Sequence, residues 1–324
     1  MGIFFGYDNQ SKKDGSGAQV QRIFAIYSLT KFIGVGFANE EIIDIDFNPG
    51  DGINTHAEMQ EYIGKLNSFL DFLNASKPTN PILKRINFVH GFRFKWFNRI
   101  YFAYMGLQSM IIKRDYLYLI SDPYPLIDKY PQAYSHLKLV SPFLGTGLRR
   151  DIISIQLHVA RAKVSENHMS ERFTKNEWYL RILDEITSAI TSAGKEYEIL
   201  IHTDLTGERI WEVPQGANEE TLKYWNDAGI IDSEGRLVLQ DLSELSGFDN
   251  YKNLSIVSNI DPISAWRIMS EADFLLIAKS SFSFVGALLN RKGLVISPYF
   301  WSKGPESWLT LEHGIEISKY KIEL

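Results

Sequence analysis

The sequence predicts an α/β protein built from two Rossmann-like halves, and three observations support this fold class. Short apolar runs alternate along the chain with longer stretches whose apolar residues recur at helical spacing, which favours mostly parallel sheets covered by helices. The chain has 324 residues, which corresponds to two domains at roughly 100–200 residues each. Apolar residues make up 45% and charged residues 23% of the chain, a balance typical of folded globular proteins.

The first half opens as a strand, a loop and a helix. The apolar run Ile3–Phe5 precedes the polar loop Tyr7–Gly17, and Ala18–Phe32 then carries apolar residues near one helical stripe. This order is the usual start of an α/β unit. The pattern further predicts a strand at Ile42–Phe47, a helix at Asn54–Leu73 and a short strand at Ile86–Val89.

The second half repeats the alternation after a segment that reads as a linker. Asp122–Phe143 contains four prolines, so we expect an N-terminal domain over residues 1–145 and a C-terminal domain over residues 146–324. Predicted strands are Ile152–Val159, Glu198–His202, Leu254–Val257, Phe274–Ala278 and Leu294–Ser297, and predicted helices are Lys175–Ala193, Glu219–Ala228, Pro262–Glu271 and Ser281–Asn290.

Composition narrows the function classes. The formal net charge is −5, whereas nucleic-acid binders usually carry an excess of Lys and Arg, so we expect no nucleic-acid partner. The chain has no cysteine, which excludes disulfides and thiolate chemistry and is compatible with the cytoplasm. No run approaches the ~20 apolar residues of a membrane span, and the first residues do not have the pattern of a signal peptide.

The loops that follow strands hold the candidate site residues, because parallel α/β sheets bind ligands beyond the carboxyl ends of their strands and at helix N-termini. In the first such loop, Gly15 and Gly17 precede a helix and allow a close approach of the backbone to a ligand. The glycines match only part of a dinucleotide fingerprint, since Val20 occupies the third glycine position. A flexible loop leading into the helix explains the same residues.

Two loops of the second half combine charged residues with a strand end. His158, Arg161 and Lys163 follow one predicted strand, and arginine can bind a phosphate through two hydrogen bonds. Thr203 and Asp204 follow the next strand, where an Asp also serves as a turn or capping residue. Solvated surface charges beside a packed histidine are the structural alternative for the first loop.

A third loop, Lys279–Ser283, has three hydroxyls and a cation at the start of a predicted helix. Unpaired backbone N–H groups and the positive end of the macrodipole lie there, so the loop suits a diphosphate. A single serine would satisfy the need for an N-cap. Three serines and a lysine exceed that need and favour a binding role.

Taken in order, four motifs resemble those of the fucosyltransferase-like glycosyltransferases, which include bacterial α-1,2- and α-1,6-fucosyltransferases and animal core fucosyltransferases. In this family a Gly-x-Gly-x-Gln helix start precedes a His-x-Arg-Arg strand end, a Thr-Asp strand end and an Ala-Asp-strand-Ser-Ser-Phe-Ser segment. The matching residues are Gly15, Gly17 and Gln19; His158 and Arg161; Thr203 and Asp204; and Ala272–Ser283, and with the helix that ends at Asn290 they span residues 15–290.

The resemblance implies a GT-B fold, with two Rossmann-like domains that face a central cleft and the nucleotide in the C-terminal one. It implies metal-independent transfer, with inversion and without a cofactor, of a sugar from a nucleotide-diphosphate donor to a glycan hydroxyl, as in polysaccharide biosynthesis. A GDP-sugar is the candidate donor and fucose the candidate sugar. The donor-binding residues would be Gly15, Gly17, Gln19, His158, Asp204, Lys279, Ser280, Ser281 and Phe282.

The resemblance also assigns catalytic roles. Arg161 would neutralise the departing diphosphate, an electrostatic stabilisation of developing charge. The chain departs from the family here, because Ala160 stands where the family has the first of two arginines. A general base should be a carboxylate or histidine, and Asp14 and His56 are the candidates in the first half.

Three alternatives remain open. Asp44 and Asp46 have the spacing of a metal motif if they lie on one strand face, although solvated acids at a strand edge explain them too. A nicotinamide-dependent oxidoreductase would use the same paired α/β units, but it requires the complete glycine fingerprint. A degenerate glycosyltransferase that only binds nucleotide or carbohydrate fits the substitution at Ala160.

Residues 84–114 contain seven Lys or Arg residues, no acid and many aromatics, with Phe92, Phe94 and Trp96 alternating as in a strand. Cations beside Trp and Tyr suit a membrane interface, so this stretch predicts weak peripheral contact with anionic lipid or with a lipid-linked glycan acceptor. A core strand and helix with solvated charges is the alternative interpretation.

Overall fold

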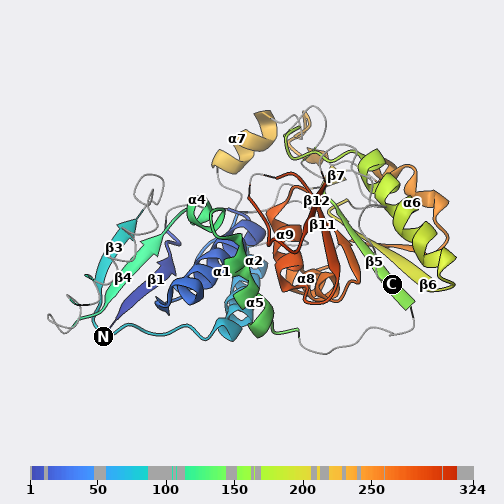
Figure 1. The fold of residues 1–324 in the computed structure, drawn as a ribbon. Helices are drawn as coiled ribbons and strands as arrows, with labels where there is room; N and C mark the ends of the chain where they lie inside the picture. Colours follow the sequence, from blue (N-terminus) through green and yellow to red (C-terminus); the bar gives the residue numbers. More distant parts are fainter. Residues whose placement is uncertain are drawn as a thin grey trace. The chain divides into compact units, whose positions relative to one another are not determined.

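The computed structural model describes residues 2–10, 14–46, 56–86, 104, 107, 114–143, 152–161, 164, 169–205, 210–211, 219–227, 231–238, 242–258, 260–300 and 302–311. The chain forms two compact units, each assembled from more than one stretch (Figure 1). Unit 1 comprises Met1–Ile45, Glu61–Pro142 and Ser302–Glu306, and unit 2 comprises Asp46–Gln60, Phe143–Trp301 and Ser307–Leu324. The predicted boundary between residues 145 and 146 lies outside the described residues.

Unit 1 contains a parallel sheet of four strands in the order β2-β1-β4-β3. The strands are β1 (Ile3–Tyr7), β2 (Gly36–Phe37), β3 (Ile82–Ile86) and β4 (Tyr116–Ile120). Helix α1 (Ser16–Ile33) packs on β1, and α2 (His56–Leu70) is followed by the short 3-10 helix η1 (Asp71–Leu73). The predicted opening of strand, loop and helix is therefore confirmed.

Helix α1 is the centre of unit 1. Its residues from Ser16 to Thr30 are buried apart from Ala18, because short helical segments cover the side that the sheet leaves open. These segments are α4 (Tyr124–Ile127), η2 (Pro131–Tyr134) and α5 (Ser135–Val140). The linker predicted over these residues is thus wrong, since the segments are helical and several of their apolar side chains, among them Ile127 and Leu137, are buried.

The predicted strand at Ile42–Phe47 is also wrong over its described residues, 42–46, which are irregular. The backbone of Ile42 is satisfied by one side chain instead of a strand: its N–H donates to Asn67 Oδ1 and its carbonyl accepts from Asn67 Nδ2, both at 2.9 Å. The second strand of the sheet is the two-residue β2. Of the strand expected at Ile86–Val89, only Ile86 lies within the described residues, as the last residue of β3.

Unit 2 contains a parallel sheet of six strands in the order β12-β11-β10-β5-β6-β9. Read from β9, this is the Rossmann order 3-2-1-4-5-6 in chain numbering. The strands are β5 (Ile152–Val159), β6 (Glu196–Thr203), β9 (Leu254–Val257), β10 (Phe274–Leu276), β11 (Leu294–Pro298) and β12 (Leu309–Leu311), and a separate antiparallel pair is formed by β7 (Ile210–Trp211) and β8 (Leu237–Val238).

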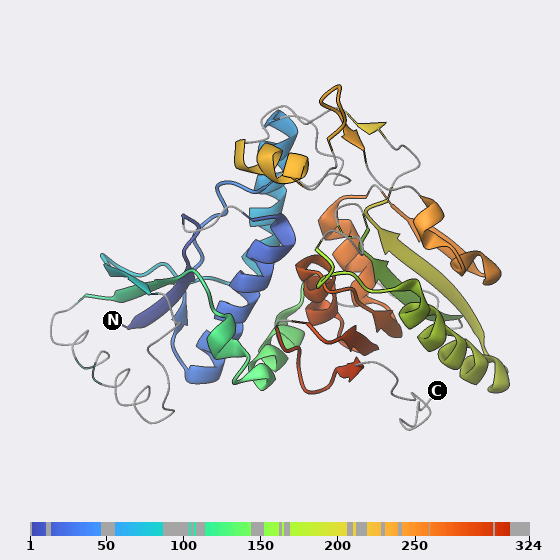
Figure 2. The same ribbon diagram turned by 90° about the horizontal axis from the view of Figure 1, so that it is seen from above.

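Helices cover both faces of this sheet (Figures 1 and 2). The helices on the two faces are α6 (Asn176–Ser192) on one side and α8 (Pro262–Ser270) and α9 (Ser281–Leu289) on the other. Unit 2 also contains α7 (Glu219–Asp227) and the short 3-10 helices η3 (Leu242–Leu245) and η4 (Phe248–Asn250). The five strands and four helices predicted for the second half are confirmed to within a few residues at their ends. The α/β class with two Rossmann-like units is therefore confirmed, while the central cleft stays a prediction.

The alternation along β5 explains how unit 2 is layered. Ile155, Leu157 and Val159 join the apolar core beneath α6. The residues between them are polar, and Gln156 Nε2 donates to the carbonyl of Ile268 in α8 at 3.0 Å, so the polar face of β5 lies against α8. This face ends at His158, which brings a polar side chain to the carboxyl edge of the sheet.

Among the described residues, no helix combines the length and the apolar character needed to cross a membrane.

Candidate functional site

The strand order of unit 2 reverses between β5 and β10. Strands β6 and β9 continue from β5 in one direction, and β10, β11 and β12 continue in the other. β5 and β10 are direct neighbours, with Leu157 opposite Leu276. Parallel sheets with this order bind ligands outside the carboxyl ends of the strands at the reversal. Two of the sequence motifs follow these two strands, so the fold brings His158 and Lys279–Ser283 to one edge.

Two of the three serines at the start of α9 make hydrogen bonds within the protein. Ser280 is the N-cap, and its Oγ accepts from the backbone N–H of Phe282 at 3.3 Å. Ser283 is fully buried, and its Oγ donates to the carbonyls of Ala278 and Ser280 at 3.3 and 3.2 Å. These two hydroxyls therefore serve the fold.

Ser281 and Lys279 are the groups left for a ligand. Both are half-buried at the carboxyl edge of the sheet, and neither side chain makes a hydrogen bond or ion pair within the part of the chain that the structure describes. The first turn of α9 adds backbone N–H groups and the positive end of its macrodipole. A hydroxyl, an ammonium and a helix N-terminus together form a seat for an anion such as a phosphate.

An aromatic cluster fixes the start of α9. The centroid of the Phe282 ring lies 5.2 Å from that of the His158 ring and 5.7 Å from that of the Trp266 ring. Trp266 Nε1 also donates to the carbonyl of Phe282 at 2.9 Å, which ties α8 to the first turn of α9. Sequence reasoning missed Trp266, because a tryptophan on the apolar face of a helix reads as ordinary core.

The histidines at the strand ends are neutral. His158 lies opposite His202 on the neighbouring strand, and His202 Nε2 lies 3.0 Å from Gln156 Oε1. Burial lowers the pKa of His158 to about 3, with further contributions from His202 and Arg161, and burial lowers the pKa of His202 to about 4. Neither side chain is a cation at neutral pH, so His158 can contact a ligand only as a neutral hydrogen-bonding group.

Arg161 is turned into the fold. Its Nη2 donates to the Thr174 carbonyl at 2.7 Å and to Asn176 Oδ1 at 2.6 Å, and its guanidinium carbon lies 4.5 Å from the centre of the Phe173 ring. Only 1% of the residue is exposed. In this structure the guanidinium joins the end of β5 to the start of α6. Its assignment to the diphosphate stays a prediction, and Lys163 lies outside the described residues.

Asp204 and Thr203 join the ends of β5 and β6. The backbone N–H of Arg161 donates to Asp204 Oδ1 at 2.8 Å, and Thr203 Oγ1 donates to the carbonyl of Val159 at 2.8 Å. The His158 and Thr203 motifs are therefore in direct contact. Within these contacts, Asp204 orders the loop that follows β5.

The candidates of the first half lie in unit 1, at the start of α1. Gln19 donates from Nε2 to the carbonyls of Asp14 and Asp44, at 2.9 and 2.7 Å, so its amide holds the loop together. Gly17 is buried, whereas a Cβ added at Gly15 would meet no atom within 4 Å. Asp14 forms an ion pair with Arg22, a residue that sequence reasoning did not single out.

Two further predictions concern carboxylates and a histidine. Asp44 and Asp46 lie on an irregular segment, so the strand geometry assumed for a metal motif is wrong. The described residues contain no group of three or more His, Asp or Glu side chains placed to hold a metal ion. His56 is exposed in the first turn of α2, and its role as a base stays a prediction.

Most of the basic stretch at residues 84–114 lies outside the described residues, including the expected strand around Phe94. Its described cations make internal contacts: Lys84 Nζ lies 5.2 Å from the centre of the Tyr116 ring, and Arg85 Nη2 donates to Gln10 Oε1 at 2.8 Å. Tyr104 and Leu107 are exposed, at 56% and 54%. Contact of this stretch with lipid stays a prediction.

No protein-family model matches the chain, and no curated protein matches it. Solved structures similar to the chain include E. coli heptosyltransferase WaaC with ADP-2-deoxy-2-fluoro heptose, at 10% identity and TM-score 0.37 over 96% of this chain and 93% of that one. POFUT1 in complex with GDP matches at 11% identity and TM-score 0.39 over 91% and 98%. NodZ alpha-1,6-fucosyltransferase soaked with GDP-fucose matches at 9% identity and TM-score 0.31 over 89% and 92%.

TM-scores below 0.4 carry no argument about activity or ligands. The functional proposal therefore rests on the residues of this chain.

Proposed function

We propose that this chain is a glycosyltransferase whose unit 2 binds a nucleotide-diphosphate sugar at the carboxyl edge of β5 and β10. One observation carries the proposal. Where the strand order reverses, the half-buried side chains of Ser281 and Lys279 make no hydrogen bond or ion pair within the described residues, and they flank the N-terminus of α9. This is the place and the chemistry that a diphosphate needs.

The same groups suit the chemistry of sugar transfer. An acceptor hydroxyl gives its proton to a carboxylate or histidine base, for which Asp14 and His56 are the candidates, and its oxygen attacks the anomeric carbon. The bond from that carbon to the diphosphate oxygen breaks, and negative charge builds up on the leaving diphosphate. The Lys279 ammonium, the Ser281 hydroxyl and the N–H groups of α9 are donors fixed in advance for that charge. Such donors can act without a metal ion, in keeping with the metal-independent, inverting mechanism that the motifs imply.

The finer features of the proposal follow from the motif resemblance. They are a GDP-sugar donor, fucose as the candidate sugar, a glycan or lipid-linked glycan acceptor, and action in the cytoplasm at the membrane face. No cofactor is proposed, and residues 84–114 would supply a weak lipid contact. Arg161 enters this proposal with a changed role, because its internal bonds support a function in ordering the β5 loop.

Calorimetric titration with GDP, ADP, UDP, CMP and dTDP tests the donor site. We expect one nucleoside diphosphate to bind, and we expect Ser281→Ala to weaken it by about 1.5–3 kcal/mol, the contribution of one hydrogen bond to a charged group. Lys279→Met should weaken it further. Ser255→Ala and Lys292→Met, at exposed positions of unit 2, are the matched controls and should leave the affinity unchanged. Equal affinity of Ser281→Ala and the wild type would reject the site.

A non-catalytic nucleotide-binding protein is the second candidate, and the internal bonding of Arg161 favours it, because the cation assigned to the leaving group is already engaged. Sustained release of nucleoside diphosphate from a nucleotide sugar separates the two candidates. Turnover supports the transferase, whereas binding without turnover supports the second candidate. Adding NAD to the titration tests the oxidoreductase alternative.

A further inference from the structure

Unit 1 contains a buried charged cluster that the donor site does not use. Arg22, in the second turn of α1, is 7% exposed. Its guanidinium forms an ion pair with Asp14, its Nη1 lies 3.4 Å from Tyr7 Oη, and its guanidinium carbon lies 6.0 Å from the centre of the Tyr124 ring. Nε is buried and has no hydrogen-bond partner among the described residues.

The cluster lies where the fold of unit 1 favours a ligand. Tyr7 is the last residue of β1, and Tyr124 begins α4 just after β4. In the order β2-β1-β4-β3, β2 lies on one side of β1, and β4 and β3 lie on the other. The reversal therefore falls between β1 and β4, and their carboxyl ends carry the cluster.

Within the part of the chain that the structure describes, the Asp14 carboxylate is held through one oxygen only. Its Oδ2 is buried and paired with Arg22, yet 37% of the side chain is exposed. Oδ1 has no hydrogen bond to any residue that the structure describes. The neighbouring Gly15 leaves open space where a Cβ would stand.

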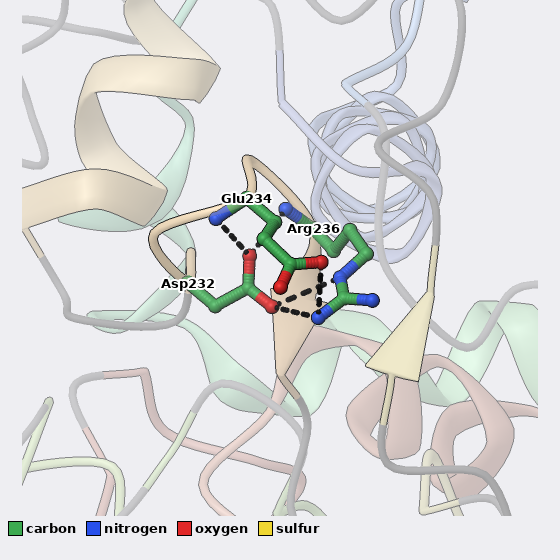
Figure 3. A network of polar contacts seen from close by, with 3 residues as sticks. All are labelled: Asp232, Glu234 and Arg236. Atoms are coloured by element: carbon green, nitrogen blue, oxygen red, sulfur yellow. Dashed lines mark hydrogen bonds and ion pairs between the residues drawn. The ribbon is translucent and has the colours of Figure 1, made fainter.

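A structural Asp–Arg pair of the same chain looks different (Figure 3). Asp232 Oδ1 accepts the backbone N–H groups of Glu234 and Arg236 at 2.9 Å each, and Oδ2 accepts Arg236 Nε and Nη2 at 3.0 and 2.9 Å. Both oxygens of Asp232 are occupied within one turn. Among the described residues Asp14 has only the one partner, Arg22, although Arg22 is more buried than Arg236.

The fold keeps Arg22 charged despite its burial. Burial lowers the pKa of Arg22, but Tyr124, Asp14 and Tyr7 raise it by more, so the net shift is upward. A buried ion pair often stabilises a protein no better than apolar residues of the same volume do. Stability alone therefore does not explain why Arg22 is held beside the partly exposed carboxylate of Asp14. A ligand bound by that carboxylate does explain it.

We propose that Asp14 binds a hydroxyl group of a sugar through Oδ1, and that Arg22 is the positioning residue that holds Oδ2. This inference rests on the proposed function, in which a sugar acceptor must bind to the protein, but the site lies wholly within unit 1. A carboxylate with a free oxygen accepts hydrogen bonds from hydroxyls, and a guanidinium on its other oxygen fixes its orientation.

Ligand-observed NMR on the full-length chain tests the site with glucose, galactose, mannose, N-acetylglucosamine and fucose as probes. We expect saturation transfer to at least one sugar. The Asp14→Ala variant should bind that sugar about tenfold more weakly or not detectably, because one charge-assisted hydrogen bond is lost. Asp232→Ala, which breaks the saturated pair, is the matched control and should bind like the wild type. Absence of binding by every probe, or unchanged binding by Asp14→Ala, would overturn the proposal.

Formate rescue isolates the role of Arg22, since a purely structural arginine would not produce it. Added formate should restore sugar binding to Asp14→Ala, because Arg22 can hold a free carboxylate, and should fail to restore binding to the Asp14→Ala, Arg22→Met double variant. Equal rescue of both variants would refute the positioning role. GDP titration of the same samples reports on unit 2 separately, so loss of nucleotide binding with intact sugar binding would reject only the donor site.

Discussion

Replacing Arg161 by methionine removes a buried guanidinium that joins three segments of unit 2. Nη2 bonds to the Thr174 carbonyl and to Asn176 Oδ1, and Asn176 Nδ2 donates in turn to the Glu244 carbonyl at 2.7 Å. The bond from Nη1 to the Ala160 carbonyl is local and adds little. Two bonds between segments are thus lost, and the buried Thr174 carbonyl and the part-buried Asn176 Oδ1 lose their charged donor.

The expected loss of stability follows from these bonds. At about 1.5–3 kcal/mol for each hydrogen bond to a charged group, two bonds give roughly 3–6 kcal/mol. The buried methionine regains part of this through its apolar side chain, so we expect a net loss of about 3 kcal/mol. For a domain of this size, that loss lowers the unfolding temperature by roughly 6–12 °C.

Thermal unfolding followed by circular dichroism measures the effect. The matched control is Arg181→Met, which removes an exposed arginine from α6 and should stay within about 0.5 kcal/mol of the wild type. The sequence motif alone predicts the opposite pattern for Arg161, a loss of transfer with folding intact. If Arg161→Met melts with the wild type and loses nucleotide affinity, the guanidinium serves the ligand and the structural account is wrong.

Two further predictions concern pH and lipid. His158 and His202, whose folded pKa values are lowered to about 3 and about 4, stay neutral in the fold while the unfolded chain binds protons below pH ~6.5. Their contribution to the free energy of unfolding is therefore complete above pH ~6.5. Below that pH it falls by about 1.4 kcal/mol per histidine for each pH unit, which gives a loss of roughly 4 kcal/mol in total at pH 5. Urea unfolding at pH 7.5 and pH 5 measures this, and equal stabilities would contradict it. In flotation assays, we expect salt-sensitive binding to anionic vesicles and none to neutral ones, and no binding to either would reject a lipid contact at residues 84–114.

The sequence predicted unit 2 far better than unit 1, for physical reasons. Strand β5 was predicted at its observed bounds, because alternating buried residues are a local signal. Pro262, directly after the N-cap Asp261, indicated the start of α8. The irregular segment around Ile42 was mistaken for a strand, because its backbone is satisfied by Asn67, 25 residues away. No local sequence pattern predicts a hydrogen bond between residues so far apart in the chain.

In the candidate site too, the features set by neighbouring residues could be predicted, and those set by distant residues could not. The start of α9 could be predicted because serines at a helix N-terminus are a local signal, but which serine serves the fold depends on packing. Arg22 could not be found, since a single arginine in a helix usually reads as a solvated residue. Its burial follows from the segments that cover α1, which come from residues about 100 positions later.

Amide hydrogen exchange with and without GDP tests the donor site most directly, because it locates the bound diphosphate on the chain. The account predicts slower exchange of the N–H groups in the first turn of α9, at Ser281, Phe282 and Ser283, and at the end of β5 near His158. ADP and UDP in parallel report the preferred base. Nucleotide binding with unchanged exchange at these residues, and protection elsewhere, would contradict the central claim.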